Sequence, residues 1–111
     1  MEQKRVSFAV AKAIKEAGYP QACGLWYNKS GVEFSYTEDY SECYARPTYL
    51  NVWRWLWREK KYRIEIAIDK STDKAYPIIN NHTDFIFDSE EDPEEAIIAA
   101  IEYLATNDLI K

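Results

Sequence analysis

The sequence predicts an α+β fold: a two-layer sandwich in which three helices pack on a mainly antiparallel sheet of four to five strands. Three segments place apolar residues at helical spacing. The segments between them alternate apolar with polar residues or are rich in β-branched and aromatic residues. The expected order is helix, two strands, helix, two or three strands, helix. A chain of 111 residues, 47% of them hydrophobic, suits a single α+β domain spanning residues 1–111.

The first helix is expected over residues 3–17. Its apolar residues recur at helical spacing and share one face, which consists of Val6, Val10, Ala13, Ile14 and Ala17. Gly18 tolerates the positive φ that follows many helices, and Pro20 cannot continue a helix. The helix should therefore end just before Gly18.

A β-hairpin is expected next, because two segments rich in β-formers, residues 24–28 and 32–37, are joined by turn residues 28–31. The second of these segments alternates apolar and polar residues. This alternation predicts a buried face consisting of Val32, Phe34 and Tyr36. The polar, tyrosine-containing residues 38–46 are typical of a loop.

A second helix is expected over residues 48–60, with Thr48 as its N-cap. On a helical wheel its core face comprises Tyr49, Val52, Trp53 and Leu56, with Leu50 and Trp57 at its margin. Trp55 falls about 240° from Tyr49, on the polar side of the helix. It shares that side with Asn51, Arg54 and Arg58.

A strand is predicted by strict alternation over residues 62–69, which places Tyr62, Ile64, Ile66 and Ile68 on one face. Residues 70–74 have turn composition, so residues 75–80 should return antiparallel. Pro77 removes one donor from that strand and indicates an edge strand or a bulge. Residues 84–88 (DFIFD) are expected to add a short further strand.

The last helix has a specific start signal at residues 92–95 (DPEE). Asp92 is a suitable N-cap, Pro93 suits the first helical position, and the glutamates place negative charge where the helix dipole favours it. The predicted buried stripe of this helix is Ile97, Ala100, Ile101 and Leu104.

No residues combine into a catalytic, cofactor-binding or metal-binding motif. His82 is the single histidine, so a nucleophile and base pair would have to join it to Cys23 or Cys43, and no orienting group accompanies either pairing. The two cysteines have no further Cys or His at metal-ligand spacing, and the three glycines lie too far apart to cradle a phosphate. We therefore expect a protein that is not an enzyme and that uses no cofactor or metal ion.

Charge is unevenly distributed along the chain, whose formal net charge is −5. Residues 46–74 carry eight basic and four acidic side chains, whereas residues 84–111 carry nine acidic side chains and one lysine. This asymmetry predicts a dipolar surface able to steer a charged partner or to let two copies meet head to tail.

The feature of the second helix that the core does not explain is its Trp/Arg surface, consisting of Asn51, Arg54, Trp55 and Arg58. Tryptophan and arginine are enriched in the energetic centres of protein interfaces. The leading hypothesis is therefore a small interaction module whose partner is another protein or a second copy of itself, as in a homodimer.

Two alternatives stay open. The basic-aromatic helix 48–60 has the residue types that stack on bases and contact phosphates, although the net charge disfavours binding to a polyanion. The acidic C-terminal helix, conversely, has a charge suited to imitating DNA and so blocking a DNA-binding protein of a host.

Three segments carry a resemblance to a known family: AKAIKEAGYP (residues 11–20), ARPTYLNVWRWLWREK (45–60) and DPEEAIIAAIEYL (92–104). Together they resemble a family of small uncharacterised proteins encoded by phages and prophages of gut bacteria. In that family the central segment reads APTY, followed by a helix that ends in WLREK. This chain differs by Arg46 before the proline and by additional tryptophans at positions 53 and 57.

The resemblance implies an α+β domain of unknown function in the cytoplasm of a bacterial or phage-infected cell, and it transfers no catalytic residue. A cytoplasmic location also agrees with the residues themselves. No apolar run reaches the roughly 18–20 residues that span a bilayer, and the start MEQKRVSFAV lacks the apolar core of an export signal. We therefore expect no membrane partner.

Overall fold

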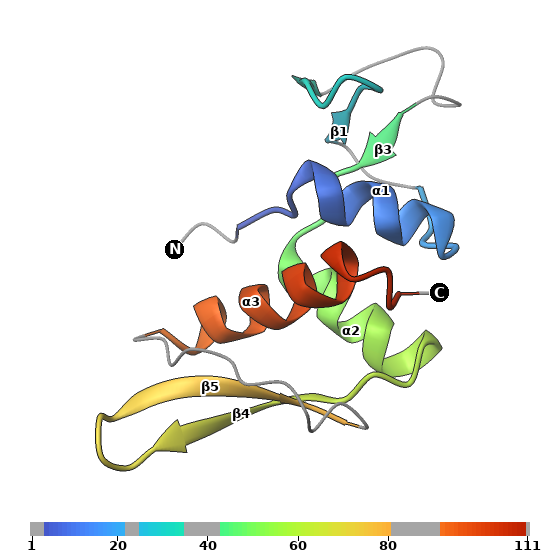
Figure 1. Cartoon of the computed structure of the whole chain (residues 1–111). Coiled ribbons are helices and arrows are strands. Elements are labelled where there is room, and N and C mark those ends of the chain that lie inside the picture. The colour runs from blue at the N-terminus through green and yellow to red at the C-terminus, as the bar shows by residue number, and fades with distance from the viewer. Residues whose placement is uncertain (1–3, 22–24, 35–42, 81–91, 111) are drawn as a thin grey trace.

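The computed structural model describes residues 4–21, 25–34, 43–80 and 92–110, and it has the predicted α+β composition. Three helices alternate with five short strands along the described chain (Figure 1). The elements are α1 (Phe8–Glu16), β1 (Trp26–Tyr27), β2 (Glu33–Phe34), β3 (Tyr44–Ala45), α2 (Tyr49–Glu59), β4 (Ile64–Asp69), β5 (Lys74–Ile79) and α3 (Pro93–Thr106).

The described strands form two separate antiparallel sheets, so the prediction of one sheet covered by a single layer of helices is wrong. One sheet has the order β2-β1-β3 and the other is the hairpin β4-β5. The sheets lie at opposite ends of the molecule with the helices between them (Figure 1). The small sheet has its own apolar cluster of Trp26, Cys43 and Ala45, separate from the main core.

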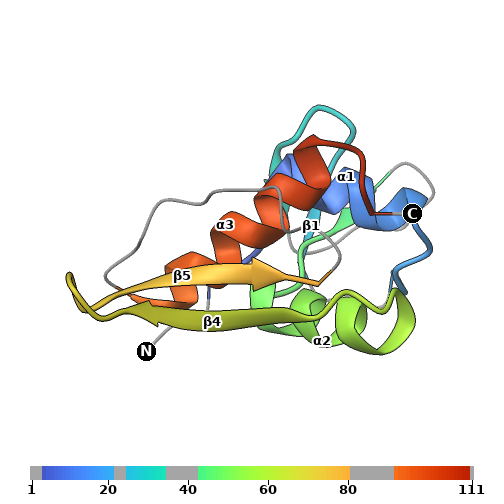
Figure 2. The same ribbon diagram turned by 60° about the horizontal axis from the view of Figure 1, so that its bottom comes forward.

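The main core lies where the three helices meet the β4-β5 hairpin. Helix α3 packs against α1 and α2 and also covers the hairpin, mainly β5 (Figure 2). Side chains from all three helices, from Tyr27 and from both long strands form one buried cluster, which includes Val10, Ile14, Val52, Leu56, Ile64, Ile79, Ile101 and Leu104. Burial of this apolar surface supplies the main driving force for folding.

Helix α1 starts later than the sequence predicts. Ser7 is its N-cap, with a side chain that accepts a hydrogen bond from the Val10 amide at 3.3 Å, so residues 4–6 are not helical. They instead run beside the segment that leads into α2. The Val6 amide donates to the Pro47 carbonyl at 2.9 Å, and the Tyr49 amide donates to the Lys4 carbonyl at 3.1 Å. These bonds join residues far apart in sequence. They satisfy backbone groups of residues 4–6 in place of the bonds of an additional helical turn.

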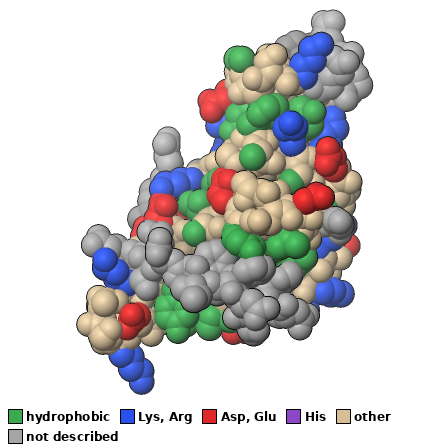
Figure 3. Space-filling model, in the orientation of Figure 1, with side chains coloured by type: hydrophobic (Ala, Val, Ile, Leu, Met, Phe, Trp, Pro, Cys, Tyr) green, Lys and Arg blue, Asp and Glu red, His purple; other side chains and the backbone are tan. Residues whose placement is uncertain are grey.

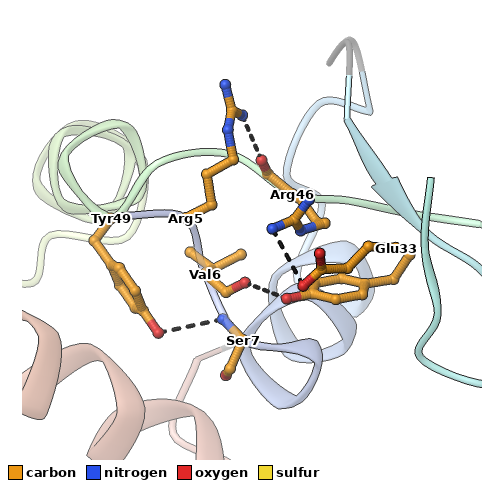
Figure 4. A network of polar contacts seen from close by, with 7 residues as sticks. Arg5, Val6, Ser7, Glu33, Arg46 and Tyr49 are labelled. Atoms are coloured by element: carbon orange, nitrogen blue, oxygen red, sulfur yellow. Dashed lines mark hydrogen bonds and ion pairs between the residues drawn. The ribbon is translucent and has the colours of Figure 1, made fainter. Parts of the chain in front are cut away.

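Side-chain bonds reinforce this junction (Figure 4). The Tyr27 hydroxyl donates to the Val6 carbonyl at 2.7 Å, and the Arg5 guanidinium donates to the Arg46 carbonyl at 2.7 Å. The Tyr49 hydroxyl accepts from the Ser7 amide at 3.2 Å and also donates to the Glu102 carboxylate. Tyr49 therefore connects the starts of α1 and α2 to α3.

The helix start signals at Thr48 and Asp92 are confirmed. The Thr48 side chain accepts from the Asn51 amide at 3.2 Å, and the Asp92 carboxylate accepts from the Glu94 amide at 2.9 Å. In α3, the predicted residues Ala100, Ile101 and Leu104 are buried together with Ala96, and Ile97 is partly buried against the core. The sequence thus predicts both bounds of α2 to within one residue, and it predicts the start and the buried stripe of α3.

The predicted hairpins are also present, with two differences. Trp26 pairs with Phe34 across β1 and β2, but Val32 is 59% exposed rather than buried, because it precedes β2 and the sheet there is only two residues long. Within residues 38–46, predicted as a loop, Tyr44 and Ala45 form β3. The expected strand at 84–88 and the predicted burial of Tyr36 lie outside the described residues.

Candidate interaction surface

Helix α2 places two arginines between two tryptophans on one side and a third tryptophan on the other. At 100° per residue, Trp53 and Trp57 lie on one side of Arg54 and Arg58, and Trp55 lies on the other. Of the predicted surface residues, Arg54, Arg58 and Asn51 are exposed and Trp55 is half-buried. We call Arg54 and Arg58 the arginine ridge.

A shallow, open hollow lies on the Trp55 side of the arginine ridge, and we call it the Trp55 hollow. All four predicted surface residues line it, so the structure brings them together. The Trp55 ring meets Tyr19 edge to face with 5.1 Å between ring centroids, and the Lys60 ammonium lies 5.4 Å from the Trp55 centroid. The full lining is Tyr19, Pro20, Asn51, Arg54, Trp55, Arg58 and Glu59.

The end of α1 places Tyr19 beside Trp55. Gly18 has φ +96°, the Gly18 amide donates to the Lys15 carbonyl at 3.1 Å, and the Tyr19 amide donates to the Ile14 carbonyl at 2.9 Å. This bond pattern is a Schellman motif, which turns the chain sharply at the end of a helix. The predicted stop signal at Gly18 therefore also builds one wall of the Trp55 hollow.

A second hollow lies on the other side of the arginine ridge, lined by Trp53, Arg54, Trp57 and Arg58; we call it the Trp57 hollow. The two tryptophan rings meet edge to face at 6.4 Å. The indole N–H of Trp53 donates to the Ile64 carbonyl at 3.0 Å, which fixes that ring against β4. The Arg63 guanidinium lies 4.4 Å from the Trp57 centroid and donates to the Trp57 carbonyl.

The tryptophans correct two expectations of the sequence. Trp57, expected beside the core, is 39% exposed even though Arg63 is stacked on it, because it lies at the margin of the core face in the last turn of α2. Trp55, expected on the exposed side, is half-buried because Tyr19 and Lys60 contact it. The helical wheel does not reveal these contacts because all three partners lie outside α2.

The surroundings of the arginine ridge are basic. Between residues 51 and 63 the sequence has five basic side chains and one acidic side chain, Glu59. Elsewhere the charges are mixed: on the face shown in Figure 3, acidic and basic side chains are interspersed rather than separated into two poles. Lys4 at the start of the described chain forms an ion pair with Glu95 in the first turn of α3. The acidic start of α3 is thus partly neutralised.

Of the remaining candidate groups, the structure describes one, Cys43. Cys43 is buried in the small sheet, and Cys23 and His82 lie outside the described residues. Across the described ranges, no three His, Cys, Asp or Glu side chains are grouped as metal ligands. None of the helices in these ranges combines the length and the apolar character needed to cross a membrane.

Comparison of the chain with protein-family models, with curated proteins and with solved structures finds no match. The residues of this surface are therefore the basis on which a function can be assigned.

Proposed function

We propose that the protein is a small interaction module that binds another protein, or a second copy of itself, through α2. The observation that supports this proposal is the position of Arg54 and Arg58 between two hollows that are each lined by tryptophan. The phage or prophage setting implied by the three resembling segments belongs to the same proposal.

The chemistry of the surface suits a protein partner. A guanidinium is planar and weakly hydrated, so it can pair with carboxylates and stack on rings at low desolvation cost. Half-buried tryptophans such as Trp55 present a large apolar area that is already fixed by Tyr19 and Lys60, which lowers the entropy lost on binding. Loss of one such residue at the centre of an interface typically costs at least about 2 kcal/mol, or roughly thirtyfold in affinity.

A nucleic-acid partner is the second candidate. Five basic residues and three tryptophans between residues 51 and 63 favour it, and the net charge of −5 opposes it. Imitation of DNA by the acidic C-terminal helix receives less support, because Glu95 is paired with Lys4 and Glu102 accepts a bond from Tyr49.

The self-association form of the proposal is tested by measuring solution mass by light scattering over a wide concentration series. The wild type should rise above the monomer mass, and both Trp55→Ala and the double variant Arg54→Glu/Arg58→Glu should stay at it. The double variant Lys12→Glu/Lys70→Glu makes the same charge change at exposed positions outside α2, so it should behave as the wild type does. Monomer masses for every protein would exclude self-association.

The second-protein form is tested with a photo-crosslinking amino acid at position 51, which lies in the Trp55 hollow. A defined adduct should form in the cell of origin and disappear in the Arg54→Glu/Arg58→Glu background. The same probe at position 70, in the β4-β5 turn, should give no such adduct. Absence of a position-specific adduct, together with monomer masses, would overturn the proposal.

Oligonucleotide binding separates the nucleic-acid candidate. Phosphate contacts weaken steeply between about 50 and 200 mM salt, because bound counterions are released. Salt-dependent binding of single- or double-stranded oligonucleotides that is lost in Arg54→Glu/Arg58→Glu would favour nucleic acid over protein.

A further inference from the structure

The two outer edges of the β4-β5 hairpin differ in their exposed backbone groups. The Asn80 amide donates to the Arg63 carbonyl at 3.1 Å, in register with the pairs from Ile64↔Ile79 to Asp69↔Lys74. In an antiparallel ladder the backbone groups of successive residues point alternately toward the partner and away from it. Residues 63, 65, 67 and 69 therefore face β5, and residues 64, 66 and 68 face outward.

The same alternation of backbone groups makes the outer edge of β5 a protected edge. Its outward-facing residues are 75, 77 and 79, and the middle one is Pro77, which has no N–H to offer. Proline at an outward position is one of the ways in which proteins block edge strands. Pro77 thus costs the ladder no hydrogen bond and interrupts the row of donors that another strand would use.

The outer edge of β4 has no such block. The Ile64 carbonyl accepts the Trp53 indole N–H, but Ile66 and Ile68 each keep an outward N–H and C=O that form no hydrogen bond with a described residue. The pairing runs from Ile64 to Asp69 without a bulge, and the Ile68 side chain is 52% exposed. Strand β4 lies on the side of the hairpin away from α3 (Figures 1 and 2). This edge can therefore accept one more strand opposite Ile66 and Ile68.

The side chains of β4 set the chemistry that such a strand must have. Ile66 and Ile68 are on the face that the hairpin turns toward the core, while Glu65 and Asp69 are on the opposite face. The Asp69 carboxylate accepts bonds from the Ser71 hydroxyl at 2.7 Å and the Ser71 amide at 2.9 Å. These bonds lower the pKa of Asp69, so it stays ionised at neutral pH.

We propose that the free edge of β4 binds an extended segment of another protein with the pattern basic, apolar, any residue, apolar, basic. Backbone bonds to Ile66 and Ile68 would join the segment to the sheet, as in other cases of strand addition. Its two apolar residues would lie beside those isoleucines. Its two basic residues would lie directly opposite Glu65 and Asp69, where unlike charges stabilise a cross-strand pair.

A second copy of this chain is a poorer occupant. Because Ile66 and Ile68 are the β4 residues whose outward groups no described residue bonds, two antiparallel β4 strands would have to pair Ile66 with Ile68 of the other copy. This register places Glu65 directly opposite a second Asp69, twice per dimer, and like charges in that position repel. The same carboxylates thus oppose self-pairing and favour a basic segment.

The site is separate from the arginine ridge and does not depend on the function proposed above. Its probe is the peptide acetyl-SKITIKS-amide, titrated into uniformly ¹⁵N-labelled protein and followed by amide NMR signals. The amides of Ile66 and Ile68 should shift and become protected from hydrogen exchange. Those of Glu65 and Ala67, which already face β5, should change much less. The acidic peptide acetyl-SEITIES-amide should bind about tenfold more weakly.

Two variants complete the test. Ile68→Pro removes an outward N–H as Pro77 does on β5, so it should abolish binding with the hairpin intact. Glu65→Lys/Asp69→Lys keeps the edge and should reverse the preference between the two peptides, and it gives an answer even if Ile68→Pro fails to fold. Equal affinity for both peptides in the wild type, an unchanged preference in the lysine variant, or no shift of Ile66 and Ile68 would overturn the proposal.

Discussion

The inner and outer sides of α2 have different surroundings: the inner side is buried in the core and the outer side is exposed. On the inner side Tyr49, Val52 and Leu56 are buried in the main core, and on the outer side Arg54 and Arg58 are exposed between two tryptophan-lined hollows. Residues on the inner side should therefore determine stability, and those on the outer side should determine binding. The difference teaches that one helix can supply both roles when its two sides are contacted by different parts of the chain.

Leu56→Ala should have the largest effect on stability. Leu56 is fully buried in the main core, and leucine-to-alanine changes at such sites cost about 2–5 kcal/mol in free energy of unfolding. Urea denaturation followed by circular dichroism measures this loss. Trp57→Ala, one residue further along, is the control: it removes more atoms but from a half-exposed ring, so it should cost less. A larger cost for Trp57→Ala would contradict the assignment of the two sides.

Tyr49→Phe should have the next largest effect, because it keeps the buried ring and removes the hydroxyl that joins the three helices. The Ser7 amide would lose its acceptor and Glu102 its donor, at a cost of about 1–3 kcal/mol. Tyr76→Phe, on the outer face of β5, is the matched control and should change stability little. Equal effects of the two changes would show that the Tyr49 hydroxyl does not join the helices.

Tyr49→Phe should also change how the stability of the protein depends on pH in the alkaline range. Burial, followed by the bond to Glu102, raises the pKa of Tyr49 above its ordinary value. A raised pKa means that the folded protein keeps this proton when the unfolded chain begins to release it, near pH 10. The contribution of Tyr49 to stability is thus complete below pH 10 and is lost as the pH rises further. Tyr49→Phe should remove this part of the alkaline loss of stability.

These elements also show which features of the structure can be predicted from the sequence. Thr48 and Asp92 predict their helix starts because a cap depends on residues within one turn, and alternation predicts β4 for the same local reason. The surface residues Asn51, Arg54, Trp55 and Arg58 were found because the wheel of α2 is also local. What the sequence could not show is that Tyr19 and Pro20 complete the Trp55 hollow.

Most of the wrong predictions involve contacts between distant segments. Residues 4–6 are extended because Pro47 and Tyr49 form hydrogen bonds with their backbone. A local sequence pattern cannot predict a hydrogen-bond partner more than forty positions away. Likewise, alternation does not reveal whether two groups of strands share a sheet. The wheel of α2 also does not show how far the core extends along the helix, so it did not reveal that Trp57 in the last turn is 39% exposed.

Gly18→Ala tests the turn that places Tyr19 against Trp55 on α2. It should lower the free energy of unfolding less than the two changes above. The φ of +96° at Gly18 strains any residue with a Cβ, and no atom within 4 Å would clash with it, so only the strain of about 1 kcal/mol should appear. Tyr19 should shift with it, which would change Trp fluorescence through the Tyr19 and Trp55 contact. Gly18→Asn, which tolerates this conformation better, should cost less. No difference between alanine and asparagine would argue against the strained turn.

Arg54→Glu/Arg58→Glu should have the smallest effect on stability. It therefore gives the clearest test of the difference between the inner and outer sides of α2. Both side chains are exposed, so the core is unchanged; the main cost is negative charge in the last turn, where the helix dipole disfavours it by about 0.3–1 kcal/mol. Urea denaturation should thus place this variant close to the wild type, well above Leu56→Ala. If it instead unfolds as easily as Leu56→Ala, the outer side of α2 is also structural, and loss of binding in this variant could no longer be assigned to the arginine ridge.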